Sequence, residues 1–315
     1  MFAARCIGVS LAVFVLLYVV ASFGVSQGWR LMWRILESHS ARRSADWLFA
    51  LRVLPLSLSL TVTVVFTLPS FLLLEPHSTN EAIGTLPMVL GFFCVMLLAV
   101  GFMRAVAAQR QTSRAIEGWL NGSSAMETST GVPVFRTGEG TPTLTVAGVR
   151  DAKVLVSEAT VAALTPPELR TALRHEMVHV RRYDNLKKLI FRFVAFPGMK
   201  HLEHVWSEQT EMAADDAAVS SVNDALDLAA ALIKVSKLGA VACPGELSTA
   251  LLHSSMALRA RVTRLFAWTQ AHRPDPHRRR WWFALPPAAA AMICLVATYS
   301  SALTSMHAVT EWLVR

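Results

Sequence analysis

The sequence His175-Glu176-Met177-Val178-His179 decides how the rest of this chain is interpreted. On a helix, residues four apart lie on one face, so His175 and His179 can direct two imidazole nitrogens at one metal ion. Glu176 stands next to His175, and its carboxylate can reach a water molecule on that ion. Zinc in a catalytic site usually takes three protein ligands and leaves the fourth position to water. The motif supplies two ligands, and we therefore expect a third further along the chain.

The residues before the motif predict that it lies on a helix. Thr165, Pro166 and Glu168 have the form of a capping box, with Thr165 as the N-cap and proline in the first helical position. No proline or glycine occurs from Leu169 to Leu186. The alternative to a metal site is an amphipathic surface helix with two solvated histidines, because H-E-x-x-H also occurs by chance.

Glu211 is the candidate for the third ligand. It begins an alanine-rich segment, residues 211–218, whose composition favours a helix. Glu211 and Asp215 are four apart and share a face of that helix. Glu211 can then bind the metal while Asp215 accepts the N–H of a ligating histidine, which fixes the tautomer and orientation of the ring. Glu208, one turn earlier, is the main rival for the third position.

Other polar residues near the motif have more than one interpretation. His201 and His204 are either a surface pair, which we favour, or alternative ligands or stabilisers of a reaction oxyanion. Asp184 either orients a neighbouring group or simply ends the helix. The four cysteines are scattered and form no C-x-x-C pair, so we expect neither a disulfide framework nor a cysteine metal site.

The composition indicates that part of the chain is buried in lipid. Its residues are 53% hydrophobic and only 17% charged, and the mean hydropathy is +0.42. Apolar runs that reach the roughly 20 residues needed to cross a bilayer span residues 6–28, 53–74, 82–103 and about 281–303. We interpret the first run as a retained helix in preference to a signal peptide, because its apolar core is long and basic residues follow it.

The positions of lysine and arginine predict how these helices are oriented. The connector from 26 to 52 carries five arginines, whereas the connector from 75 to 81 has no lysine or arginine. Arginines also follow the third run and precede the fourth. Because positive residues favour the cytoplasmic side, we expect a multi-pass protein of the inner membrane with both termini outside. Most of the net charge of +8 flanks the membrane helices, so direct binding of nucleic acid is not expected.

The chain therefore divides into three N-terminal transmembrane helices in 1–104, a cytoplasmic domain in 105–280, and a fourth transmembrane helix with a short tail in 281–315. This is a membrane α-helical architecture with an α+β soluble domain.

Within the soluble domain, short β-prone pieces separated by glycine and threonine predict a small sheet; they are residues 132–135, 143–147 and 153–156. Binding of a substrate in extended form by a strand beside the metal helix is a hypothesis for this chain, by analogy with other zinc peptidases. Helices are expected at about 224–238 and 247–269. The basic segment 185–196 is either a helix on the membrane surface or an ordinary core-facing helix.

The residues from Arg174 to Asp184 resemble the H-E-[LM]-x-H-[IV]-x-R-x-D segment of the BlaR/MecR-type membrane metallopeptidases, the antibiotic-sensing transducers and their relatives. Phe196-Pro197 is similar to the F-H-P turn of that family without its histidine. Residues 211–216 are similar to its E-x-x-C-D-D segment, with Ala214 in place of the cysteine. Three helices, a cytoplasmic domain and a fourth helix is also the order in that family.

The resemblance implies a gluzincin-type zinc metalloprotease domain, with His175, His179 and Glu211 as ligands of Zn²⁺ and Glu176 as the catalytic base. It implies an endopeptidase that cleaves itself or a cytoplasmic transcriptional repressor after a signal arrives through the membrane helices. The antibiotic sensors also carry a penicillin-binding domain, and this chain has no S-x-x-K, S-D-N or K-T-G sequence. Acylation by a β-lactam in that way is therefore not expected.

Two other functions fit the same sequence. A membrane quality-control protease of the HtpX type also joins membrane helices to H-E-x-x-H and E-x-x-A-D. A non-catalytic membrane scaffold is the third interpretation, and the intact Glu176 and ligand set argue against it. The sequence leaves open whether two copies form a homodimer, and it does not identify the substrate or the signal.

Overall fold

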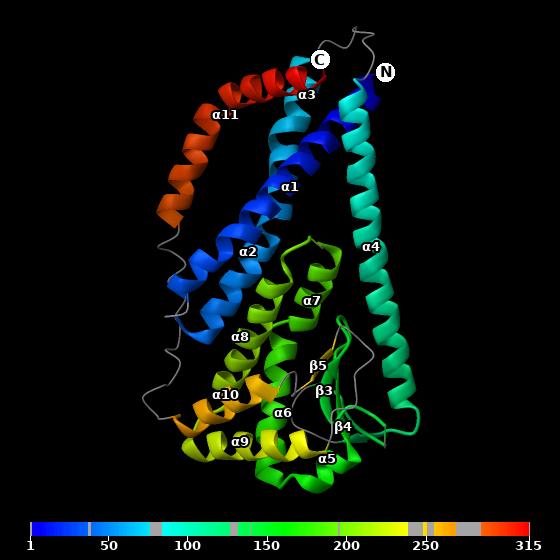
Figure 1. Ribbon diagram of the computed structural model, residues 1–315, viewed down its shortest axis with the longest axis vertical. Coiled ribbons are helices and arrows are strands. Elements are labelled where there is room, and N and C mark those ends of the chain that lie inside the picture. The colour runs from blue at the N-terminus through cyan, green and yellow to red at the C-terminus, as the bar shows by residue number, and fades with distance from the viewer. Residues whose placement is uncertain are drawn as a thin grey trace. The chain divides into compact units, whose positions relative to one another are not determined.

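A computed structural model describes residues 2–36, 39–75, 84–126, 132–138, 140–194, 196–238, 248–250, 255–268 and 285–314 (Figure 1). The chain forms two compact units. The first unit contains residues 1–32, 50–100 and 275–315, and the second contains residues 33–49 and 101–274. The two units are described separately below.

Long apolar helices build the first unit. Among the described residues, three helices are long and apolar enough to cross a membrane, Phe2–Arg34, Ala41–Leu74 and Thr85–Leu120. They correspond to α1 (Phe2–Leu36), to α2 (Ala41–Val62) continued by η1 (Thr63–Thr67) and α3 (Leu68–Leu74), and to α4 (Thr85–Leu120). This finding supports a membrane protein. The first two predicted runs fall on these helices, and so does the third from residue 85 onwards, while residues 82–83 lie outside the described part of the chain.

The fourth predicted span coincides largely with α11 (Leu285–Val314), while residues 281–284 lie outside the described part of the chain. Its role as a membrane span stays a prediction. Within the first unit, Arg5 at the start of α1 lies 3.0 Å from Glu75 at the end of α3. The Tyr299 hydroxyl of α11 donates to the Val65 carbonyl of η1 at 2.8 Å. Polar contacts therefore join α1, α3 and α11.

A small mixed sheet lies in the second unit. Its strands follow the order β1-β2-β4-β3-β5, where β2 and β4 are parallel and the other neighbours are antiparallel. The bounds are β1 (Ser124–Met126), β2 (Val134–Thr137), β3 (Leu144–Ala147), β4 (Lys153–Ser157) and β5 (Ser248–Ala250). The three predicted strands are confirmed with small shifts at their ends, and β1 and β5 were not predicted.

The prediction of a helix at 247–269 was wrong for the first residues of that range. Residues 248–250 form β5, which pairs with β3, and the helix α10 (Ser255–Phe266) comes after it. Pairing with a strand about a hundred residues earlier overrides the local preference of this segment. The predicted helix at 224–238 is confirmed as α9 (Val222–Lys237).

The remaining helices of the second unit are α5 (Glu158–Ala163), α6 (Pro166–Arg181), α7 (Asp184–Phe193) and α8 (Lys200–Ala218). Helix α6 packs against α8, α9 and β3. The core between α6, α9 and the sheet contains fully buried aliphatic side chains, among them Leu228, Leu232, Val154 and Val156. The capping box is confirmed, because the Glu168 carboxylate accepts the Thr165 N–H at 2.8 Å. The H-E-x-x-H helix is thus anchored on a sheet and two helices.

A sharp turn separates α6 from α7. Helix α6 ends at Arg181, and Tyr183 adopts a left-handed backbone conformation with φ 55°. A non-glycine residue seldom takes this conformation, which costs about 1–2 kcal/mol. The turn starts a new helix at Asp184 and brings this carboxylate back towards the end of α6.

Gly101 marks a close approach between α4 and the end of α7 in the second unit. A Cβ atom at this position would lie 2.4 Å from the backbone oxygen of Phe193. We expect Gly101→Ala to destabilise the protein by about 1–3 kcal/mol, as overpacking does elsewhere. Gly118 on the same helix is the control, because a Cβ there meets nothing within 4 Å. Gly118→Ala should be neutral or stabilising, and equal melting temperatures for both variants in detergent would contradict the proposed approach.

Candidate metal centre

The two histidines of the motif face each other from one side of α6. His175 and His179 are 0% and 2% exposed, and their rings meet edge to face. Their Nε2 atoms lie 3.2 Å apart. This distance follows from the helical spacing of four residues, as the sequence predicted.

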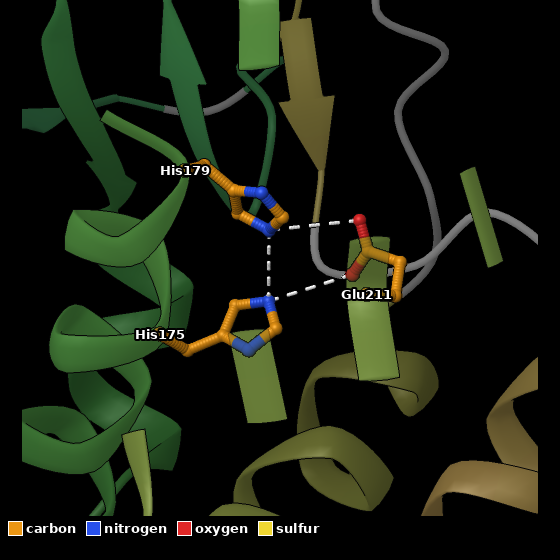
Figure 2. Close-up of side chains that lie close together, drawn as sticks. All are labelled: His175, His179 and Glu211. Atoms are coloured by element: carbon orange, nitrogen blue, oxygen red, sulfur yellow. Dashed lines mark hydrogen bonds and ion pairs between the residues drawn. The ribbon is translucent and has the colours of Figure 1, made fainter. Parts of the chain in front are cut away.

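Glu211 approaches the same point from α8 (Figure 2). Its Oε2 lies 3.4 Å from Nε2 of His175, and its Oε1 lies 3.6 Å from Nε2 of His179. Zinc ligands at 2.0–2.1 Å in a tetrahedral arrangement are about 3.3–3.5 Å from one another. One ligand atom from each of the three residues lies within 4.8 Å of the other two, which is close enough for one small cation to bind all three residues.

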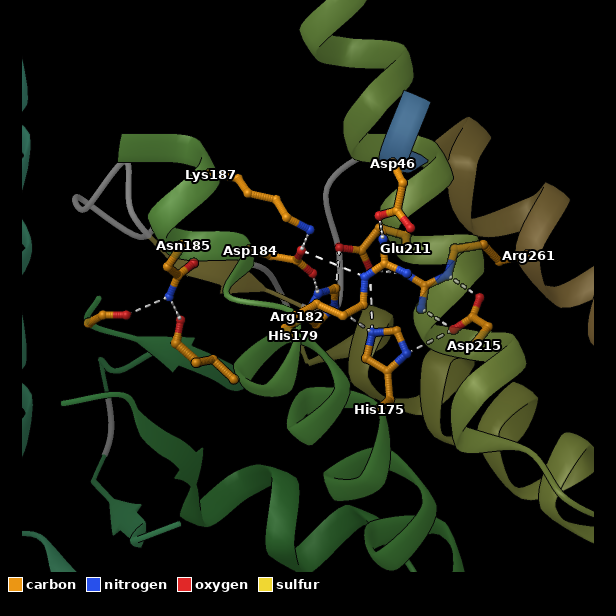
Figure 3. A network of polar contacts seen from close by, with 12 residues as sticks. Asp46, His175, His179, Arg182, Asp184, Asn185, Lys187, Glu211, Asp215 and Arg261 are labelled. Atoms are coloured by element: carbon orange, nitrogen blue, oxygen red, sulfur yellow. Dashed lines mark hydrogen bonds and ion pairs between the residues drawn. The ribbon is translucent and has the colours of Figure 1, made fainter. Parts of the chain in front are cut away.

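A carboxylate contacts the far side of each imidazole (Figure 3). Asp215 Oδ1 lies 3.0 Å from Nδ1 of His175, and Asp184 Oδ2 lies 2.8 Å from Nδ1 of His179. In the neutral rings these carboxylates favour the proton on Nδ1, which leaves the Nε2 lone pairs pointing at each other. Two lone pairs at 3.2 Å repel, unless a cation lies between them.

Negatively charged groups outnumber positively charged ones at the centre. Four carboxylates are buried there, those of Glu176, Asp184, Glu211 and Asp215. Lys187 lies 3.1 Å from Asp184, and Arg261 contacts both Glu211 and Asp215. One arginine therefore faces two carboxylates, and this excess of negative charge favours a cation. Burial acts to lower the pKa of His175, but Asp215 and Glu211 outweigh it and raise the pKa to about 9, so the cluster attracts positive charge.

Glu211 and Asp215 are held in the ionised form. Burial acts to raise the pKa of each carboxyl group, but nearby positive charge outweighs it and holds both pKa values below their usual range. For Glu211 the opposing charges are those of His179 and Arg261, and for Asp215 the largest is that of Arg261. Both groups are therefore suited to bind cations.

Glu176 is different from these two carboxylates. Both of its carboxyl oxygens are buried and have no hydrogen-bond partner within the described part of the chain. Complete burial raises the pKa of Glu176 to about 8, while His175 acts in the opposite direction. A divalent cation bound by the neighbouring histidines would lower this pKa again, towards the ionised form that a general base needs.

The rival ligands lie outside the cluster. Glu208 is 3.6 Å from His204, and the side chains of these two residues are 39% and 62% exposed. His201 is also exposed. The surface interpretation of His201 and His204 is confirmed. Within the second unit, the structure brings together His175, His179 and Glu211 as a group of metal-type ligands.

Asp184 and Arg261 are the residues whose place at the centre the sequence did not establish. The sequence left two roles for Asp184, to orient a neighbouring group or to end the helix. Its contact with Nδ1 of His179 supports the first role. Asp184 also contacts Lys187 at 3.1 Å and Arg182 at 3.8 Å. Arg182 also contacts Asp46 of α2 at 3.2 Å. Charged side chains therefore connect the first turns of α2 with His179, a candidate ligand.

Removing the Asp184 carboxylate should loosen the centre without removing a ligand. We expect Asp184→Ala to weaken zinc binding about 10–100-fold, as the loss of a group that orients a ligand does elsewhere. Asp184→Asn, which can still accept a hydrogen bond, should lie between Asp184→Ala and the parent. Competition with a zinc chelator measures the affinity, and Asp151→Ala at an exposed position is the control. Parent-like affinity in Asp184→Ala would contradict this role.

A second group of metal-type ligands occurs in the first unit, formed by Glu75, His307 and Glu311. Glu75 is already paired with Arg5 at 3.0 Å, so part of its charge is balanced by the protein itself. His307 lies 3.8 Å from Glu75 and 3.7 Å from Glu311. The first of these contacts joins the end of α3 to α11.

A comparison with protein-family models finds no match for this chain, and a comparison with curated proteins finds none.

Proposed function

We propose that this chain is an integral-membrane zinc endopeptidase whose metal ligands are His175, His179 and Glu211. The observation that carries the proposal is that one ligand atom from each of these residues lies within 4.8 Å of the others, with the two Nε2 atoms 3.2 Å apart. Nitrogen and carboxylate ligands in this number are typical of catalytic zinc. The carboxylates behind both histidines and the excess of buried negative charge also favour a divalent metal.

Different residues of the chain have different roles in hydrolysis. When bound, Zn²⁺ supplies a water molecule of lowered pKa and polarises the scissile carbonyl. Glu176 accepts a proton from the attacking water and passes it to the leaving amine. Its buried oxygens suit this role, because no hydrogen-bond donor among the described residues occupies them. Asp215 and Asp184 hold the imidazole rings in orientation.

Within this class we favour a transducer of the BlaR/MecR type, with the protease domain on the cytoplasmic side of the inner membrane. The substrate would be the chain itself or a cytoplasmic transcriptional repressor. The contacts from Asp46 through Arg182 to Asp184 favour this assignment, because they offer a connection between a candidate membrane helix and the metal centre. A quality-control protease of the HtpX type is the alternative.

Comparison of cellular proteins in a strain with the parent chain and a strain with Glu176→Gln tests the proposal. A transducer should produce new fragments from one or two substrates, including the chain itself. Accumulation of many unrelated membrane proteins in the Glu176→Gln strain would favour quality control. Identical protein patterns in both strains under all conditions tested would support a non-catalytic scaffold and contradict the proposal.

A further inference from the structure

Arg261 comes from α10, far along the chain from the H-E-x-x-H motif, and its side chain is 4% exposed. Its Nε and Nη2 donate to the two carboxylate oxygens of Asp215, each at 2.7 Å. Its Nη1 lies 3.0 Å from Oε2 of Glu211 (Figure 3). One guanidinium therefore contacts both carboxylates that α8 contributes to the centre.

The two contacts have different consequences for the candidate ligands. The paired hydrogen bonds fix the plane of the Asp215 carboxylate, whose Oδ1 also faces Nδ1 of His175. The contact with Oε2 of Glu211 leaves Oε1, the atom nearer His179, for the metal. Arginine suits this position because its planar group presents several N–H donors at fixed angles, whereas lysine offers a single charged point.

We propose that Arg261 is a positioning residue of the metal centre, which sets the orientation of Glu211 directly and that of His175 through Asp215. The inference rests on the proposed function, since it assigns a role towards the metal. It adds α10 to α6 and α8 as an element that the centre requires. Because α10 is distant in sequence from both ligand helices, the state of the C-terminal part of the second unit then affects metal binding.

The chain offers a matched control on the same two helices. Arg264 of α10 pairs with Asp216 of α8 at 2.8 Å, one residue on from Asp215. The side chains of this pair are 40% and 31% exposed, and neither belongs to the group of candidate ligands. Arg261→Lys and Arg264→Lys therefore make the same chemical change, once inside the centre and once at the surface.

The test is titration of the metal-free full-length chain in detergent with Co²⁺, which reports its coordination through its visible absorption spectrum. Arg261→Lys should weaken Co²⁺ binding about 10–100-fold and change the spectrum, because the Glu211 carboxylate is no longer held. Arg264→Lys should bind within about 2-fold of the parent, since exposed ion pairs contribute little. A second variant, Arg261→Met with Asp215→Asn, removes both partners of the buried pair and should also bind weakly with a changed spectrum.

The outcomes test the role of Arg261 separately from the existence of the metal centre. Absence of Co²⁺ and Zn²⁺ binding by the parent would overturn the proposed function and this inference with it. If the parent binds while the folded Arg261→Lys variant has the parent affinity and spectrum, the centre stands and the role of Arg261 is wrong. A lower melting temperature for Arg261→Lys with unchanged affinity and spectrum would also overturn it, because Arg261 would then serve only the fold.

Discussion

Glu176→Gln is expected to retain one zinc per chain and to lose peptide-bond cleavage by about 10²–10⁴-fold, the usual contribution of a general acid–base. Glutamine has nearly the same shape as glutamate, so the buried position stays filled, but its amide cannot accept the proton of the attacking water. Glu176 is not among the three candidate ligands, and its removal therefore leaves the metal in place. The measurement combines zinc analysis of the purified chain with cleavage of its own sequence or of a candidate repressor.

Two results bear directly on this role of Glu176. Parent-like cleavage by Glu176→Gln would remove it from the reaction. Loss of zinc together with activity would instead make it a ligand or a residue needed for the fold. Glu208→Gln, which makes the same change at a half-exposed position on α8, is the matched control and should cleave as the parent does.

Glu211→Ala is expected to weaken zinc binding by more than about 100-fold, beyond the loss that follows when only an orienting residue is removed. The side chain supplies the one carboxylate that faces both Nε2 atoms, at 3.4 and 3.6 Å. Its truncation also leaves Arg261 with fewer negative partners in a buried place. Zinc content after dialysis, and affinity in competition with a chelator, measure the effect.

Glu208→Ala tests Glu211, which the sequence favoured because Asp215 follows on the same helical face, against its rival Glu208. This variant should keep the parent's zinc, because Glu208 faces His204 and not the histidine pair. The opposite pattern, with zinc lost in Glu208→Ala and kept in Glu211→Ala, would show that the ligand assignment is wrong.

The part of the centre that depends on helical spacing was predictable from the sequence. A separation of four residues on one helix places His175 beside His179, and the same spacing places Asp215 on the face of Glu211. The capping box before α6 was predictable because its hydrogen bond is local, from Glu168 to Thr165. Each of these predictions involves residues within one or two turns of each other.

Contacts made by the fold over long distances were not predictable in the same way. Arg261 is one of three arginines in α10, and the packing of α10 against α9 and α8 decides which of them is buried. The contact of Asp184 with His179 depends on the left-handed Tyr183, where neither glycine nor asparagine signals a turn. Residues 248–250 form strand β5 because they pair with β3, although their local composition favours a helix.

X-ray absorption at the zinc edge of the purified full-length chain tests the central claim most directly. The account predicts about one zinc per chain, bound by two imidazole nitrogens and by oxygen at about 2.0–2.2 Å. Glu211→Ala should remove this signal. A sulfur ligand at about 2.3 Å, a single imidazole, or a purified chain that binds no zinc would contradict the convergence of His175, His179 and Glu211 on one metal ion.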